Sequence, residues 1–177
     1  MYKIALFLHV TGALLLCAAI TIEWICIISI RKGNVTERIR ESLFHYSKVG
    51  KIGDMAAFLI LVPGIYMMVV VWKDAPWAIV GFFGLLLIGV IGGAVTGRKM
   101  KRAREIIKME NHVSQQLTEL LNNNALWVSI QTRTAILLGV IFLMTVKPGL
   151  TESIVTMALS VLLGALPLRI RRTSLIQ

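Results

Sequence analysis

Four ionisable side chains fall within or at the edge of long apolar stretches of this sequence: His9, Glu23, Arg133 and Lys147. A charged group in hydrocarbon costs a few kcal/mol unless it is paired or hydrated, so such residues are the first candidates for function. Glu23 and Arg133 reach a similar depth if both stretches cross a bilayer, and we predict an ion pair between them. The pair has two possible roles, a structural pin or a charge relay or substrate gate. The alternative is no contact, with Glu23 reaching the membrane interface beside Trp24.

A second group, of histidine and methionine side chains, lies at a predicted depth near the outer side of the membrane. His9, Met67, Met68 and Met144 all fall there. Imidazole and thioether groups form a ligand set that suits copper(I) or haem iron. We favour the other interpretation, in which the methionines fill gaps in the packing and His9 donates a hydrogen bond to a carbonyl of a neighbouring helix.

Three glycines recur at four-residue spacing, at Gly89, Gly93 and Gly97. Such a stripe lets two helix backbones approach closely in a membrane. We predict close packing inside the bundle, and the alternative is a contact between two copies of the chain. Whether the protein forms a homo-oligomer is therefore left open.

The sequence carries no recognisable catalytic motif. It lacks a metalloprotease HExxH, a phosphate-binding glycine loop, a dinucleotide fingerprint and a serine-nucleophile elbow. Cys17 and Cys26 lie nine positions apart in one apolar stretch, too far for a disulfide on one helix. Whether the protein is an enzyme is uncertain, and we favour a non-enzyme.

The elements that must position these residues are membrane-spanning helices. Of the 177 residues, 56% are hydrophobic and 16% are charged, which is far more apolar than a soluble domain. We predict one all-α domain over residues 1–177, a polytopic transmembrane helical bundle with about five spans at 4–30, 55–72, 77–97, 126–146 and 151–168. An amphipathic helix is expected at 98–121 and a short interfacial helix at 37–46. The last segment is short, and whether it crosses is left open.

The basic residues predict the orientation of the bundle. Fifteen of the 19 Lys and Arg residues lie in the two long polar segments and the C-terminal tail, whereas Lys3, Lys73 and Lys147 lie on the other side. Basic segments stay on the cytoplasmic side of bacterial membranes. We therefore expect a bacterial inner-membrane protein with its N-terminus outside and its C-terminus inside. The basic segments would bind anionic lipids rather than nucleic acid.

Short motifs add a resemblance to known families. Phe7-Leu8-His9-Val10-Thr11-Gly12, Val62-Pro63-Gly64, Arg133-Thr134 and Met144-Thr145-Val146-Lys147-Pro148 resemble a family of bacterial integral membrane proteins of unknown function. That family is distantly similar to the CopD-type copper-resistance proteins and to the small membrane protoporphyrinogen oxidases. The resemblance implies that His9 faces haem or copper. Where the oxidases end the first span with an arginine and an aromatic residue, this chain has Glu23-Trp24.

These observations give three expectations for function. The first is a non-enzymatic integral membrane protein. The second is a haem- or copper-binding membrane redox protein. The third is a small transporter or channel subunit, with Glu23 and Arg133 as its gate.

Overall fold

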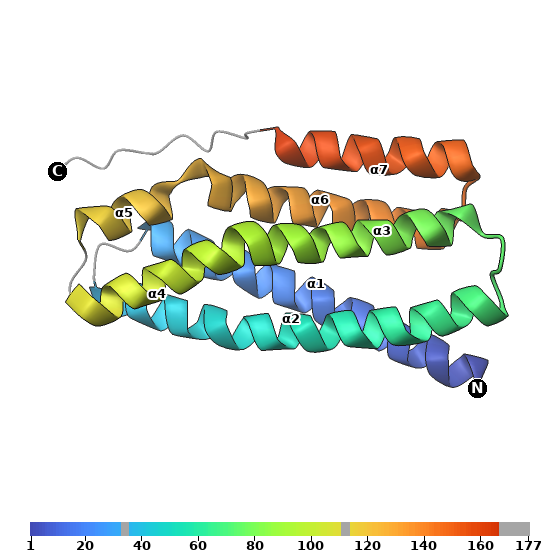
Figure 1. Ribbon diagram of the computed structural model, residues 1–177, viewed down its shortest axis with the longest axis horizontal. Coiled ribbons are helices and arrows are strands. Elements are labelled where there is room, and N and C mark those ends of the chain that lie inside the picture. The colour runs from blue at the N-terminus through green and yellow to red at the C-terminus, as the bar shows by residue number, and fades with distance from the viewer. Residues whose placement is uncertain (33–35, 111–113, 167–177) are drawn as a thin grey trace.

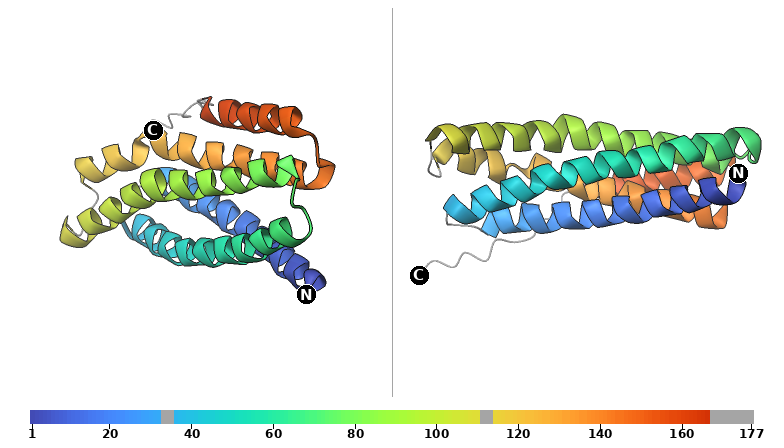
Figure 2. Two further views of the ribbon diagram at one scale, coloured as in Figure 1. Left: turned by 45° about the vertical axis from the view of Figure 1, so that its right-hand side comes forward. Right: turned by 90° about the horizontal axis from the view of Figure 1, so that it is seen from below.

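The computed structural model describes residues 1–32, 36–110 and 114–166. All its elements in these ranges are helical, as the composition predicts. The helices run along the long axis of the molecule (Figures 1 and 2). We call the end that carries the α4 and α5 helices, Arg98–Glu110 and Gln115–Asn122, the basic end. The turns at residues 71–75 and 147–149 lie at the opposite end.

Two antiparallel hairpins and one long helix build the bundle (Figure 1). The first hairpin pairs α1, Tyr2–Lys32, with α2, Thr36–Val70, and these two helices share the most extensive contacts in the molecule. The second hairpin pairs α6, Asn124–Val146, with α7, Leu150–Ala165. Between them runs α3, Pro76–Ile91, which continues through a π-helical segment η1, Gly92–Gly97, into α4. The α3 helix packs mainly on α6 rather than on α2.

Four helices are long and apolar enough to cross a membrane: Tyr2–Ile30, Ile39–Val70, Pro76–Met109 and Gln115–Val146. The protein is therefore an all-α membrane bundle. The helix that contains α6 is its centre, because 61% of its apolar stretch is buried, against 22–39% in the other three. Large apolar side chains remain exposed on α2, α3 and α7, as a lipid environment allows.

The polar segments depart from the predicted boundaries. The short helix expected at 37–46 is not separate, because the described part of α2 runs without a break from Thr36 into the span. The amphipathic helix expected at 98–121 is divided into α4 and α5, and His112 lies outside the described residues. Helical hydrogen bonding continues through the polar–apolar boundaries because nothing near residues 47–54 or 97 breaks it.

The fifth apolar helix is shorter than the others. The α7 helix has 16 residues, which makes it about 24 Å long, against a hydrocarbon core of about 30 Å. It packs along α6 on the outside of the bundle (Figure 1). Gln131 of α6 donates a hydrogen bond to the Leu166 carbonyl at the end of α7, at 2.9 Å. The residues of the predicted span beyond Leu166 lie outside the described chain.

Candidate functional site

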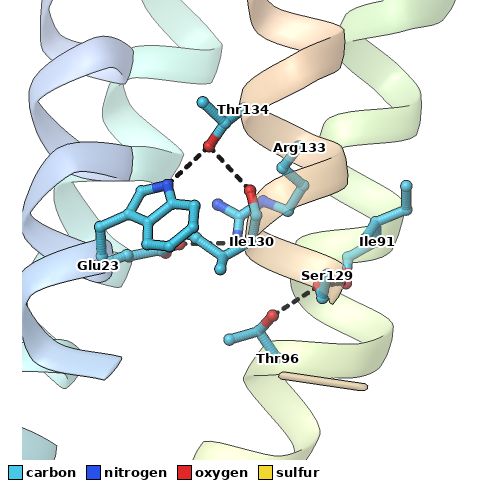
Figure 3. A network of polar contacts seen from close by, with 8 residues as sticks. Glu23, Ile91, Thr96, Ser129, Ile130, Arg133 and Thr134 are labelled. Atoms are coloured by element: carbon cyan, nitrogen blue, oxygen red, sulfur yellow. Dashed lines mark hydrogen bonds and ion pairs between the residues drawn. The ribbon is translucent and has the colours of Figure 1, made fainter. Parts of the chain in front are cut away.

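The ion pair predicted from the sequence is present in the interior. Arg133 Nη1 of α6 lies 2.7 Å from Glu23 Oε2 of α1 (Figure 3). Both residues are only 6% exposed. The prediction of this contact is confirmed, and the alternative in which Glu23 reaches the interface without touching Arg133 is wrong. The reason is electrostatic, since each charge otherwise lies alone in a medium of low dielectric constant.

The pair does not satisfy the hydrogen-bonding capacity of its own atoms. Arg133 Nη1 and Glu23 Oε2 face each other in the ion pair, and neither has a further hydrogen-bond partner among the described residues. Arg133 Nε is likewise unpartnered. Buried polar atoms are nearly always paired in proteins, and an exception indicates strain, water or a ligand.

A second set of contacts next to the pair fixes α1 against α6. Trp24 Nε1 donates to Thr134 Oγ1 at 2.8 Å, and this hydroxyl donates in turn to the Ile130 carbonyl at 2.8 Å (Figure 3). The rings of Trp24 and Trp127 meet edge to face, with centroids 4.8 Å apart. Because neighbours on both helices are held, the depth and rotation of Glu23 and Arg133 are set by more than their mutual attraction.

The π-helical segment lies on the other side of Arg133. The hydroxyls of Ser129 and Thr96 are 2.8 Å apart, and Ser129 also donates to the Ile91 carbonyl at 3.5 Å (Figure 3). A Cβ atom on Gly92, the first residue of η1, would lie 3.1 Å from the guanidinium carbon of Arg133. Glycine therefore lets the guanidinium pack directly on the backbone of η1. A π-helical turn inside an α-helix often marks a functional site.

The buried pair borders a cavity of about 310 Å³ between α1, α2, α3, η1, α4 and α6. Its polar lining comes from four helices: Glu23, Tyr46, Ser47, Asp54, Arg104 and Arg133. Glycines make up much of the remaining wall: Gly50, Gly53, Gly89, Gly92, Gly93 and Gly97. The cavity extends toward the basic end, where Arg104 donates a hydrogen bond to Ser47 Oγ at 2.7 Å.

The predicted role of the glycine stripe is corrected by this cavity. A Cβ on Gly89 or Gly93 would meet no neighbouring atom within 4 Å, and both residues are exposed, so neither packs closely on another helix of the chain. Gly97 would meet only the Gly92 carbonyl oxygen, at 3.3 Å. The stripe fails as an internal packing motif because it faces the space left between α2 and η1. Close packing instead occurs at Gly12, where a Cβ would lie 2.9 Å from the Ile60 backbone.

His9 follows the interpretation that we favoured. Its Nδ1 lies 2.8 Å from the Ile60 carbonyl of α2, and a carbonyl only accepts, so Nδ1 carries the proton. A small cavity of about 20 Å³ next to it is lined by His9, Met68 and Met144, among others. Met67 is fully buried and does not line this cavity, so the structure does not bring it together with the other members of the predicted ligand set. Met67 and Met68 point in different directions because neighbours on a helix are about 100° apart.

Lys147 lies at the C-terminal end of the α6 helix. It adopts a left-handed backbone conformation, with φ 54°, and its backbone N–H closes the last turn of α6 on the Leu143 carbonyl. Its ammonium group lies over the rings of Trp72 and Trp77, 5.8 and 5.6 Å from their centroids. Lys147 is thus exposed at the end opposite to the basic end and takes no part in the ion pair.

Reasoning from the sequence missed most of the polar lining of the large cavity. Tyr46 and Arg104 lie in segments expected to be interfacial or amphipathic, and Ser47 and Asp54 lie between the expected interfacial helix and the predicted span at 55–72. The one signal in the sequence was Asp54 directly before a run of 18 apolar or small residues. Nothing in the sequence shows that Arg104 turns toward the same space as Arg133.

The arrangement combines two arginines, two carboxylates and two hydroxyls around one internal space, which suits binding of a polar solute. In the described parts of the chain, no group of three or more His, Cys, Asp or Glu side chains is placed to hold a metal ion. The resemblance noted from short motifs stays a prediction. No protein-family model, no curated protein and no solved structure matches this chain.

Proposed function

We propose that this chain is a non-enzymatic membrane protein that admits a small polar solute into its large cavity, as a small transporter or channel subunit does. The observation that carries the proposal is the buried Glu23–Arg133 pair at the border of a cavity of about 310 Å³. That space equals about ten water molecules at their volume in the liquid. Ionisable residues at membrane depth are expensive to keep and mark solute pathways when they line a cavity.

The proposed orientation places the cavity on the cytoplasmic side of a bacterial inner membrane. The basic residues of α4 support it, because Arg98, Lys101 and Arg102 are all exposed at the basic end. Anionic lipids of the inner leaflet would attract the same residues. The solute then enters from the cytoplasm and meets the Glu23–Arg133 pair in the wall of the cavity.

Two neighbouring cysteine substitutions test whether the cavity holds water. Cys17 and Cys26 are first replaced, since both are free thiols. In inverted membrane vesicles we expect Gly89→Cys to react quickly with a charged methanethiosulfonate reagent, because the reaction needs an ionised thiol and therefore water. Val90→Cys is the matched control at the same depth, since Val90 is 64% exposed but does not line the cavity. Equal rates for the two positions would contradict the proposal.

Copper(I) binding is a second candidate, favoured by one observation. His9, Met68 and Met144 come from three helices and line the same small cavity. One imidazole and two thioethers suit copper(I), which would supply one-electron redox chemistry when bound. A cavity of about 20 Å³ has room for an ion but not for a porphyrin. The residues therefore fit copper and do not fit haem.

The methionine pair gives this candidate an internal control. We expect stoichiometric copper(I) under reducing conditions to be lost in Met68→Leu and kept in Met67→Leu, because Met67 does not line the cavity. Both changes conserve volume and cost little stability. Retention of copper in both variants, or none in the unmodified protein, would remove the candidate.

A further inference from the structure

Unpartnered hydrogen-bond donors outnumber unpartnered acceptors around the large cavity. In the part of the chain that the structure describes, the buried lining atoms without a hydrogen-bond partner are Arg133 Nε, Arg133 Nη1, Arg104 Nε and Glu23 Oε2. Arg133 Nη1 and Glu23 Oε2 face each other in the ion pair, which leaves the Nε–H donors of Arg133 and Arg104 with no partner at all. Each buried donor left unpaired costs about 1–3 kcal/mol, and more when it belongs to a charged group. A ligand that brings acceptor oxygens relieves this cost.

The two arginines belong to different helices but line the same space. Arg104 lies on α4 and Arg133 on α6, and each guanidinium is already held on one side, by Ser47 and by Glu23 respectively. Both side chains line the cavity, so a ligand there can reach their unpartnered N–H groups. The planar guanidinium fork matches the oxygens of a carboxylate or phosphoryl group better than any other common ligand group.

The charge of the lining limits the charge of the ligand. Glu23 and Asp54 balance Arg104 and Arg133, so the ionised side chains of the cavity sum to zero. A multiply charged anion would leave a large uncompensated charge in a region of low dielectric constant. A singly charged anion leaves only one uncompensated charge. The exposed cations of α4 at the basic end add a positive potential that attracts such an anion.

The glycines leave one side of the cavity open. A Cβ on Gly50, Gly53, Gly89 or Gly93 would meet nothing within 4 Å, so no side chain closes the space between α2 and the α3–η1 helix at these positions. Apolar residues such as Leu61 and Leu85 line the part of the cavity farther from the basic end. A free solute can enter the cavity through this opening. A lipid headgroup can also enter it, with the lipid chain lying between the helices.

We infer that the large cavity binds a singly charged oxyanion, a phosphoryl or carboxylate group, through Arg104 and Arg133. The inference rests on the proposed function and names the class of its solute. The oxyanion is supplied either by a lipid headgroup or by a free anion, and both present the same acceptor oxygens to the same arginines.

Thermal stabilisation of the detergent-purified full chain tests the inference. The probes are dihexanoyl phosphatidylglycerol for a lipid headgroup, and inorganic phosphate and acetate for a free anion, with chloride at equal ionic strength as the reference. Binding to the folded state raises Tm in a saturable way. Saturation with the lipid alone assigns a headgroup, and saturation with phosphate or acetate assigns a free anion. No saturable rise with any probe overturns the inference.

Variants show whether the arginines carry the binding. We expect Arg104→Gln to raise the half-saturating concentration about tenfold or more, because a hydrogen bond to a charged group is lost. Arg102→Gln is the matched control, since this exposed residue of the same helix does not line the cavity. Equal effects of the two substitutions would show attraction by surface charge alone and would overturn the inference.

A second variant fills the cavity without removing a charge. Gly89→Leu places a side chain where no neighbouring atom lies within 4 Å, so we expect the protein to fold but to lose the saturable rise in Tm. Val90→Leu is its control. Unchanged binding in Gly89→Leu overturns the inference. If Gly89→Cys reacts in the labelling experiment while no anion binds, the proposed function stands and the inference alone fails.

Discussion

At the scale of single residues, the interior of this protein contains a charge pair that is matched in charge but not in hydrogen bonds. Glu23 and Arg133 neutralise each other at 2.7 Å, yet apart from this contact three of their atoms have no hydrogen-bond partner among the described residues. A pin that served only stability would gain from complete hydrogen bonding. Arg133 Nε stays available for a further hydrogen-bond partner, as the proposed gate would need.

Substitution of Glu23 measures the strength of this pair. Glu23→Gln leaves the guanidinium of Arg133 buried and uncompensated, so we expect the free energy of unfolding to fall by about 3–5 kcal/mol. Unfolding of the detergent-purified protein by sodium dodecyl sulfate measures the change. In the double variant Glu23→Gln with Arg133→Gln no charge stays buried, and most of the loss should be recovered. A double variant less stable than Glu23→Gln would contradict a direct coupling.

At the scale of elements, the glycines divide into two kinds that look alike in the sequence. Gly12 lets α1 touch the backbone of α2 at Ile60, where His9 also donates its hydrogen bond. Gly89 and Gly93 open a wall of the large cavity. Only the neighbours across the helix distinguish them, because spacing along one helix shows what shares a face and not what that face meets.

Alanine at these two kinds of position should have effects of opposite sign. Gly12→Ala places a Cβ 2.9 Å from backbone atoms of Leu59 and Ile60, which cannot move aside, and overpacking of this kind costs about 1–3 kcal/mol. Gly89→Ala meets open space and gains helix propensity worth up to about 1 kcal/mol. Melting temperatures of the two variants, measured in the same detergent, test this expectation. Destabilisation by Gly89→Ala as large as that by Gly12→Ala would mean that the space at Gly89 is filled.

At the scale of the whole molecule, the bundle has one polar interior and two different ends. The large cavity lies toward the basic end, whereas Lys147, Trp72 and Trp77 cluster at the opposite end. Tryptophan and lysine are typical anchors at a membrane interface. The α7 helix is shorter than the four candidate membrane spans and packs on α6 from outside, and none of its residues lines the cavity.

Cysteine accessibility in bacterial spheroplasts checks the proposed orientation. With Cys17 and Cys26 replaced, we expect Lys73→Cys to react with an impermeant maleimide in intact spheroplasts. Lys101→Cys should react only after the membrane is opened, because basic segments such as α4 tend to stay on the cytoplasmic side of bacterial membranes. Both positions are exposed, so burial does not explain a difference. The reverse pattern would invert the topology and place the cavity on the outer side.

The sequence by itself determined the class of fold and the depth of the charged residues. Runs of about 20 apolar residues must be helices in lipid, because the backbone has no other hydrogen-bond partner there, and two opposite charges at one depth attract each other. These two facts predict the helical bundle and favour the Glu23–Arg133 contact over its alternative.

The tertiary structure decided which way each helix faces. The direction of the glycine stripe, the separation of Met67 from Met68 and the approach of Arg104 to the space around Arg133 depend on helix rotation. Apolar residues surround most of these helices, so the sequence carries little signal for rotation. Rotation is fixed instead by contacts between residues far apart in the chain, such as Trp24 with Thr134 and Ser129 with Thr96.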